Sequence, residues 1–162
     1  MKSSTSARPR NKLPGIGRLW TVELHFHTAL AGAPEAVLGA TAGTPMNPAV
    51  CDAFTLAIIA GEGPPAFPGS PWREPDLPEA RRHAKRITKA MVELAKIVPD
   101  GDAYVAETSF FQRDWQRADW GANYPNLLAV KQKYDPDGLF FAWHGVGSET
   151  WTVDGFTRSP NP

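Results

Sequence analysis

Proline and glycine limit the length of every regular element in this sequence. The 162-residue chain contains 16 prolines and 14 glycines. Many of them fall in the segments 28–45, 61–75, 99–102 and 135–138. Proline lacks a backbone donor and glycine loses the most conformational freedom on ordering, so helices and strands tend to end at such segments. The sequence therefore predicts short helices and strands that are separated by irregular connections.

The segment 19–26 alternates between polar and apolar side chains. Every second residue is apolar: Trp20, Val22, Leu24 and Phe26 would lie on one face of a strand. A period of two predicts a half-buried strand with an apolar side. The next segment, 28–45, is expected to be a loop with at most one helical turn. Asn47 and Pro48 then resemble an N-cap and a first helical residue, so residues 48–60 are predicted to form a largely buried helix.

The longest predicted helix covers residues 76–98. Asp76 is its expected N-cap, and Glu79 completes a capping box three residues later. Apolar side chains at helical spacing should form its buried stripe: Ala80, Ala84, Ile87, Met91, Leu94 and Val98. Arginines and lysines crowd the other faces, which are expected to be solvated.

The C-terminal third predicts a strand, a helix and a tight turn. Residues 103–106 should form a brief strand. A helix should cover residues 123–134, with an asparagine cap and Pro125 in its first turn. Its expected inward face consists of Leu127, Val130, Lys131 and Tyr134. The turn 135–138 ends this helix, and the aromatic run 139–141 is expected to be buried.

These elements indicate an α+β fold. The prediction is that helices pack on one face of a small, mostly antiparallel sheet. Residues 1–18 are expected to be a disordered arm, and residues 19–162 a single domain. Neither repeats nor an obvious second domain interrupt this region.

Composition argues against several classes of partner. Lysine plus arginine and aspartate plus glutamate both total 17, so the formal net charge is zero. A neutral chain gives no global electrostatic case for binding nucleic acid or an acidic membrane. No apolar run reaches the ~20 residues of a membrane span, and no signal peptide is evident. Cys51 is the only cysteine, so an internal disulfide is impossible and a cytoplasmic location is expected.

His25 and His27 would project from the same side of the predicted strand. Such a pair can hold a metal if a third ligand lies nearby. The candidates for a third ligand are Glu23, His83 and His144. We expect two solvated histidines and no metal site, because no sequence spacing fixes the third ligand.

Five ordered blocks in the last third carry a family resemblance. They lie within Tyr104–Glu107, Asp114–Trp115, the continuous run Trp120–Phe140, and Gly145–Glu149. The region resembles the C-terminal part of the berberine bridge enzyme-like FAD-linked oxidases, in the vanillyl-alcohol oxidase superfamily. The berberine-like segment covers about residues 103–158, and the similarity reaches back to about residue 19, where the chain resembles part of the family's substrate domain.

The resemblance implies a role for three residues. Tyr104 matches a tyrosine beside the flavin and the substrate, and Asn123 matches an asparagine that supports a flavin-facing turn. Glu107 matches the position of a proton acceptor, so Glu107 and Tyr104 are the candidate catalytic residues. The implied function is oxidation of an alcohol or similar C–H centre of a small molecule, with FAD as hydride acceptor.

Two departures from the family pattern bear on activity. Ala106 replaces an asparagine, and Asn126 replaces an arginine. The family's phosphate-cradling loop and flavin-linking histidine have no counterpart here. The chain is therefore expected to be truncated, to lack the FAD-binding domain and to be inactive in isolation. One alternative is a non-catalytic module that pairs with a separate FAD-binding chain. The other is a small metal-dependent hydrolase that uses His25 and His27.

Overall fold

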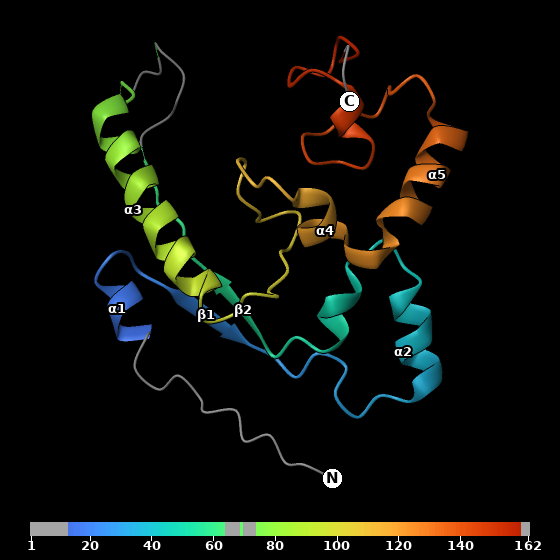
Figure 1. Ribbon diagram of the computed structural model, residues 1–162, viewed down its shortest axis with the longest axis horizontal. Coiled ribbons are helices and arrows are strands. Elements are labelled where there is room, and N and C mark those ends of the chain that lie inside the picture. The colour runs from blue at the N-terminus through green and yellow to red at the C-terminus, as the bar shows by residue number, and fades with distance from the viewer. Residues whose placement is uncertain (1–12, 64–68, 70–73, 160–162) are drawn as a thin grey trace. The chain divides into compact units, whose positions relative to one another are not determined.

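The structure is a computed structural model that describes residues 13–63, 69 and 74–159 (Figure 1). Residues 1–12, most of the expected disordered arm, lie outside the described residues. The elements are α1 (Leu13–Gly17), β1 (Glu23–Phe26), α2 (Glu35–Ala42), η1 (Pro48–Cys51), β2 (Thr55–Ile58), α3 (Leu77–Ala95), α4 (Trp115–Trp120), η2 (Gly121–Asn123), α5 (Tyr124–Tyr134) and η3 (Ser148–Thr150).

The chain forms two compact units, each built from two separate stretches of sequence. The first unit comprises Met1–Phe26 and Thr55–Asp100, and the second comprises His27–Phe54 and Gly101–Pro162. Each unit therefore needs residues from both the early and the late part of the chain.

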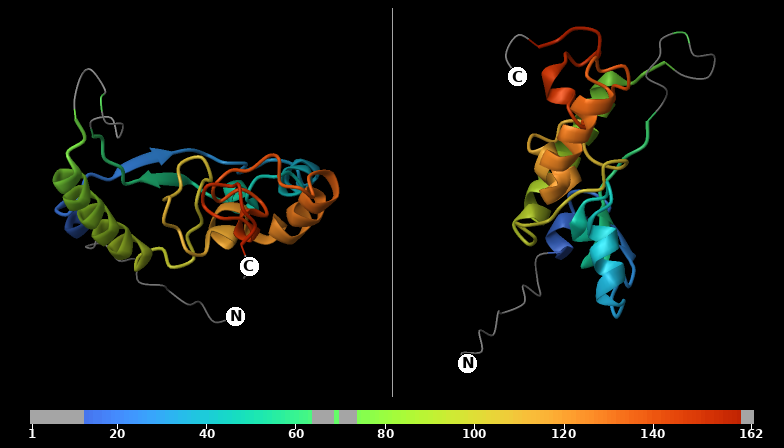
Figure 2. Two further views of the ribbon diagram at one scale, coloured as in Figure 1. Left: turned by 90° about the horizontal axis from the view of Figure 1, so that it is seen from above. Right: turned by 90° about the vertical axis from the view of Figure 1, so that its right-hand side faces the viewer.

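The first unit contains the sheet. Strands β1 and β2 pair antiparallel, with Glu23 opposite Ile58 and Phe26 opposite Thr55, and Figure 2 (left) shows the two arrows side by side. Helix α1 packs against α3. Helices together with a small antiparallel sheet confirm the predicted α+β class.

Helix α1 corrects the predicted extent of the arm. Residues Leu13–Gly17 are helical, whereas disorder was expected up to residue 18. Ile16 is only 1% exposed, and its carbonyl accepts the backbone N–H groups of Leu19 and Trp20 at 2.8 and 3.1 Å. A buried isoleucine thus fixes the chain just before the strand.

Strand β1 is shorter and more exposed than the alternating pattern predicts. It covers four residues instead of eight, and all four are exposed. Leu24 and Phe26 are 39% and 70% exposed, so the predicted half-burial is wrong for the described chain. Trp20 lies outside the strand, where its indole N–H donates to the Ala60 carbonyl at 2.6 Å.

The predicted helix over residues 48–60 is also wrong. The Asn47 side chain does cap a helical turn, because its Oδ1 accepts the Ala49 N–H at 3.0 Å. That turn ends at Cys51, however, and Thr55–Ile58 form β2. Pairing with β1 overrides the helical spacing of the apolar residues, as tertiary context commonly does for short apolar runs.

Helix α3 follows its prediction closely at the start. Asp76 Oδ1 accepts the Glu79 N–H at 2.9 Å, which confirms the expected cap. Ala90 is buried, and His83, Ile87 and Leu94 on the same side of the helix are half-buried. Ile87 and Leu94 belong to the predicted stripe, but Met91 is 42% exposed. The buried face is therefore rotated from the predicted one.

The second unit contains helix α2, which is longer than the single turn expected from the sequence. Helix α2 spans Glu35–Ala42, where at most one turn was expected. Alanine-rich sequence favours a helix even between glycines. Residues 103–106 do not form the predicted strand: residues 105–107 form a turn, and among the described residues only the Ala103 N–H joins the segment to another element.

Helix α4 joins several segments of the second unit. Trp115 and Ala118 are 8% and 2% exposed. The Ala118 carbonyl accepts two hydrogen bonds of 2.8 Å, one from the Ala103 N–H and one from Asn47 Nδ2. The Trp120 indole donates to the His144 carbonyl at 3.0 Å. Helix α4 is therefore the point where the segments around residues 47, 103 and 144 meet.

Helix α5 ends as predicted. It begins at Tyr124 with Pro125 in its first turn, and the turn after Tyr134 contains Gly138 at φ +67°. The predicted inward face is only partly correct, since Val130 and Tyr134 are 55% and 74% exposed.

The aromatic run 139–141 is largely exposed, which contradicts the prediction. Leu139 and Phe140 are both 82% exposed. Their backbone N–H groups donate to the Asp135 carboxylate at 2.8 and 3.0 Å. The carboxylate thus holds the backbone of the turn, while both side chains remain largely exposed.

No helix in the described part of the chain is long and apolar enough to cross a membrane.

We expect Asn47→Ala to lower the free energy of unfolding by about 1–3 kcal/mol, because it removes a cap and a buried hydrogen bond together. Urea denaturation measures the change. The control is Asn126→Ala, which makes the same substitution at an exposed asparagine of α5. Equal effects of the two variants would contradict the bridging role of Asn47.

Candidate functional site

Tyr104 and Glu107 lie on one turn of the second unit. The Glu107 N–H donates to the Tyr104 carbonyl at 2.9 Å, which closes the turn. Both side chains are exposed, Tyr104 to 43%. Within the described residues, neither side chain forms a hydrogen bond or an ion pair. The two candidate catalytic side chains are thus close in the chain, accessible, and available to a group from outside.

Asn123 uses its side chain differently from the prediction. It occupies the N-cap position of α5, but its side chain makes no capping hydrogen bond. Its Nδ2 instead donates to the carbonyls of Ala42, Thr44 and Met46 at 2.8, 3.0 and 3.2 Å. This amide ties η2 to the segment after α2. Its carried-over role in supporting a turn remains a prediction, because no contact with a cofactor is described.

Tyr124 and Glu149 form a half-buried, hydrogen-bonded pair in the second unit. The Tyr124 hydroxyl donates to the Glu149 carboxylate at 2.6 Å and accepts the Gly147 N–H at 3.2 Å. Burial and the carboxylate acceptor raise the pKa of the Tyr124 hydroxyl above its usual value of 10. The pair fastens the Gly145–Glu149 block to the start of α5.

Four aromatic rings stack beside this pair. His144 is 3% exposed and lies parallel to Trp115, with centroids 5.4 Å apart and 14° between planes. Trp143 stacks on His144 at 5.1 Å and on Phe110 at 5.3 Å. The Trp143 indole also donates to the Phe110 carbonyl at 2.8 Å. The stack runs from the buried Trp115 to the half-exposed Phe110, which belongs to the same loop as Glu107.

Asp119 is a buried carboxyl group that the sequence analysis did not single out. The residue is 2% exposed, and both of its side-chain oxygens lack a hydrogen-bond partner among the described residues. The Thr108 hydroxyl oxygen is also buried and unpartnered. Burial raises the pKa of Asp119, while the facing Thr108 hydroxyl and His144 act in the opposite direction. The Thr108 hydroxyl therefore faces the carboxyl group without completing a well-formed hydrogen bond.

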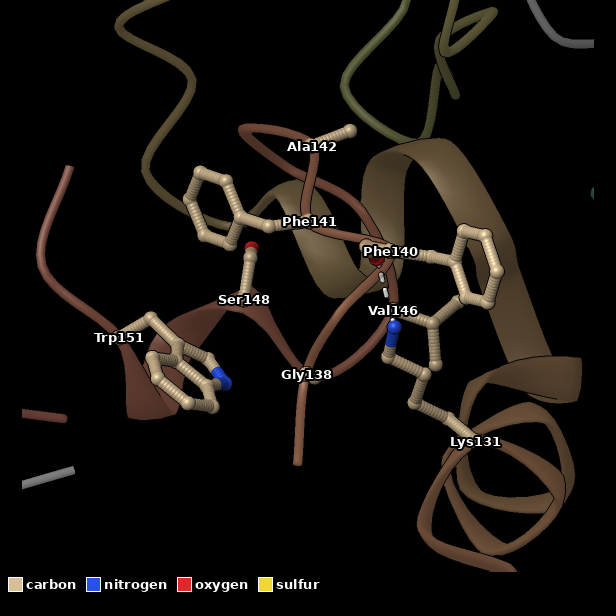
Figure 3. A pocket seen from close by; sticks show the side chains of 9 residues that line it. Lys131, Gly138, Phe140, Phe141, Ala142, Val146, Ser148 and Trp151 are labelled. Carbon is tan, nitrogen blue, oxygen red and sulfur yellow. Dashed lines mark hydrogen bonds between the residues drawn. The ribbon is translucent and has the colours of Figure 1, made fainter. Parts of the chain in front are cut away.

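A smaller and a larger hollow lie within the described part of the second unit. The smaller, about 10 Å³, has room for about one water molecule and lies between Gly138, Ser148 and Trp151 (Figure 3). Lys131 lines this hollow and donates to the Phe140 carbonyl at 2.6 Å; it also binds the Asp135 carboxylate, which lowers the pKa of Asp135.

The larger hollow, about 380 Å³, is lined by residues 27–32, Leu38 and residues 51–54. The lining residues with ionisable side chains are His27, Cys51 and Asp52. His27 Nδ1 accepts the Ala29 N–H at 3.1 Å, so the neutral ring carries its proton on Nε2. Neither hollow includes Tyr104 or Glu107.

The donor arrangement offers no support for a metal-dependent hydrolase. In the part of the chain that the structure describes, no group of three or more histidine, cysteine, aspartate or glutamate residues could hold a metal ion. His25 Nε2 lies 3.4 Å from the Glu23 carboxylate, while His83 pairs with Glu79 at 2.5 Å. His144 lies in the aromatic stack. The expectation that the chain binds no zinc stays a prediction.

The berberine and berberine-like family matches residues 103–147. The chain carries a berberine-like segment. This segment contains Tyr104, Glu107 and Asn123, together with α4, α5 and the aromatic stack.

Relatives among curated proteins are named as flavoproteins. The VAO-type flavoprotein oxidase VAO615 of Thermothelomyces thermophilus is 35% identical over 127 residues, which cover 69% of this chain and 22% of that protein. The FAD-linked oxidoreductase cheF of Chaetomium globosum is 36% identical over 67% of this chain and 17% of its own length. The FAD-linked oxidoreductase ZEB1 of Gibberella zeae is 44% identical over 39% of this chain and 11% of its own length.

The matched region is only a small part of each of these relatives. The chain spans about a fifth or less of the length of these relatives. No solved structure matches the chain. The recognised relationship therefore concerns the berberine-like segment and part of the sequence before it.

Sequence reasoning missed Asp119 and the pairing of Tyr124 with Glu149. Both Tyr124 and Glu149 stood within the quoted blocks, but their partnership links residues that are 25 positions apart. Asp119 gives one usable signal: it is an acidic residue between Ala118 and Trp120 in a helix whose other residues include two tryptophans. No spacing rule pairs it with Thr108.

We expect Tyr124 to be the last of the three tyrosines to ionise in the folded protein, because its pKa is raised by burial and by Glu149. A spectrophotometric alkaline titration should show a late step that Tyr124→Phe removes. Tyr134→Phe, the control at an exposed tyrosine, should leave the late step in place. A late step that survives in Tyr124→Phe would contradict the assignment.

We also expect Asn123→Asp to destabilise the protein more than Asn126→Asp, by about 1–3 kcal/mol in the free energy of unfolding. The carboxylate cannot donate and would face three carbonyl oxygens at position 123. Asn126 is exposed and controls for the change of charge in the first turn of α5. Urea denaturation at neutral pH compares the two variants, and equal stability would contradict the importance of the Asn123 contacts.

Proposed function

We propose that this chain is part of a FAD-linked oxidoreductase that oxidises an alcohol or similar C–H centre of a small molecule. The observation that carries the proposal is the berberine-like segment with Tyr104 and Glu107 exposed on one closed turn. Relatives of that segment are named as FAD-linked oxidoreductases, and FAD accepts a hydride when it is bound.

Glu107 is the proposed general base. Oxidation of an alcohol breaks one C–H bond, whose hydrogen leaves as hydride, and one O–H bond, whose proton needs an acceptor. A Glu107 carboxylate oxygen can take that proton if the substrate hydroxyl reaches hydrogen-bond distance. Its lack of a partner among the described residues leaves this oxygen available.

Tyr104 and Asn123 are the proposed contributors to the cofactor site. The Tyr104 ring is 43% exposed, so it can pack against a planar group and its hydroxyl can orient a ligand. The Asn123 NH₂ group is already used by three carbonyls, so its contribution is to fix η2. These residues fit a site that is completed by an FAD-binding portion, since the phosphate-cradling loop of the family has no counterpart in this sequence.

A second candidate function is a non-catalytic module that pairs with a separate FAD-binding chain. The supporting observation is the exposure of large apolar side chains: Phe111, Leu139, Phe140 and Phe156 are 82–88% exposed. Within the described residues, β1 and β2 also form a sheet of only two strands. Exposed apolar side chains and unpaired strand edges are typical of surfaces that another polypeptide covers.

We expect the chain alone to be colourless after purification and to gain flavin absorbance only with an FAD-binding portion. The test joins the portion to the chain or supplies it in trans, and compares the flavin content per chain. Stoichiometric flavin in the chain alone would contradict the proposed division of labour. Elemental analysis of the same sample tests the expected absence of stoichiometric zinc.

In the reconstituted protein, Glu107→Gln should slow flavin reduction by ~10²–10⁴-fold, because general-base catalysis typically contributes that much. Tyr104→Phe should slow it less, and Ala106→Asn should raise flavin retention or activity. Stopped-flow absorbance measures the reduction rate. Glu35→Gln, at an exposed glutamate of α2, is the matched control. Reduction at the parental rate in Glu107→Gln would place the base elsewhere.

A further inference from the structure

The loop that carries Tyr104 and Glu107 is attached to α4 at its beginning. The Ala103 N–H donates to the Ala118 carbonyl at 2.8 Å. One residue earlier, the Asp102 carboxylate accepts a hydrogen bond of 2.9 Å from Arg117. The start of the loop is therefore held by two consecutive residues of α4.

The other end of the loop faces α4 through polar atoms that have no hydrogen-bond partner among the described residues. Thr108 follows Glu107 directly, and its hydroxyl oxygen is buried without a hydrogen bond. Both carboxyl oxygens of Asp119, the next residue of α4, are in the same state. Burial of a polar atom without a partner is unfavourable because the atom loses its hydrogen bonds to water, and burial of a charged atom is more unfavourable still. We call the loop closed when Thr108 is packed against Asp119. Ionisation of Asp119 therefore strongly disfavours the closed loop unless a hydrogen-bond donor reaches the carboxylate.

The groups that act on Asp119 can be named. The Thr108 hydroxyl and His144 favour its ionised form, while burial and the Asp114 carboxylate favour the protonated form. Burial is the largest of these influences, so the pKa of Asp119 is raised above its ordinary value of 3.8. His144 is itself confined within the aromatic stack, so it cannot move freely toward the carboxyl group.

We infer that Asp119 is a positioning residue whose buried carboxyl group controls, through Thr108, whether the Glu107 loop is held against α4. The protonated carboxyl group is neutral and can donate to the Thr108 oxygen, which holds the loop. The ionised group needs donors, and opening of the loop supplies them as water. An effect of Asp119 on catalysis would require that Glu107 has its proposed role. The control of the loop by Asp119 does not depend on that role.

The direction of the pH effect follows from the raised pKa. A group that binds its proton more tightly in the closed form stabilises that form fully below 3.8, and this stabilisation is lost as the pH rises through the raised pKa. One proton is linked to the opening, so the open population should rise by up to about tenfold per pH unit in that range.

Cleavage by the endoproteinase Glu-C after Glu107 tests the inference without any flavin. The full chain is digested across a pH series, and the initial rate at Glu107–Thr108 is divided by the rate at Glu62–Gly63. The second bond lies in an exposed segment of the first unit and corrects for the pH dependence of the protease. The ratio should rise with pH in the parent and stay constant in Asp119→Asn.

Matched variants separate the role of Asp119 from general destabilisation. Asp137→Asn, at an exposed aspartate, should keep the parental pH profile. Thr108→Ser keeps the hydroxyl and should also behave as the parent. Thr108→Val removes the oxygen that accepts from the protonated carboxyl group, so its cleavage ratio should already be raised at low pH, where the parental ratio is still low.

Two results would overturn the inference. The first is a pH-dependent ratio in Asp119→Asn equal to that of the parent. The second, which decides the matter if Asp119→Asn does not fold, is an identical profile in Thr108→Val, Thr108→Ser and the parent. Failure of the reconstituted protein to reduce flavin would instead count against the proposed function and leave the loop measurement standing.

Discussion

The hydrogen bonds of the Ala118 carbonyl hold the second unit together. One oxygen accepts both the Ala103 N–H and the Asn47 side chain, so it uses both of its lone pairs on segments that are far apart in sequence. The neighbouring Trp120 adds a third segment through His144. Because α4 has only six residues, its position depends on these contacts more than on its own helical stability.

The apolar core that supports this network is small. Among the described residues, the buried apolar side chains are those of Ile16, Ala90, Trp115 and Ala118. Only two of them, Trp115 and Ala118, belong to the second unit. Hydrogen bonds such as those of Asn123 and Tyr124 therefore largely determine the conformation of this unit. Polar networks of this kind define one arrangement well but lose stability quickly when a member is removed.

The sequence predicted local structure better than it predicted burial. The Asp76 cap and the turn after Tyr134 follow from the chemistry of neighbouring residues, and both are present. Residues 55–58 form a strand because β1 lies alongside, which no local pattern reveals. The capping expectation for Asn123 failed for the same reason, since its carbonyl partners lie about 80 residues earlier. Tyr104 and Glu107 were predicted from family resemblance and stay predictions, whereas Asp119 could be recognised only from the burial that the fold provides.

The interleaving of the two units has a consequence for how the chain acquires its fold during synthesis. Residues 27–54 emerge early but belong with residues 101–162. The Asn47–Ala118 hydrogen bond cannot form until 71 further residues have been added. Contacts between residues so far apart in the sequence are slow to form, because closure of the intervening loop costs entropy before any contact is gained. The early segment must therefore wait unpartnered on the nascent chain, where its apolar residues are available to chaperones or to premature association.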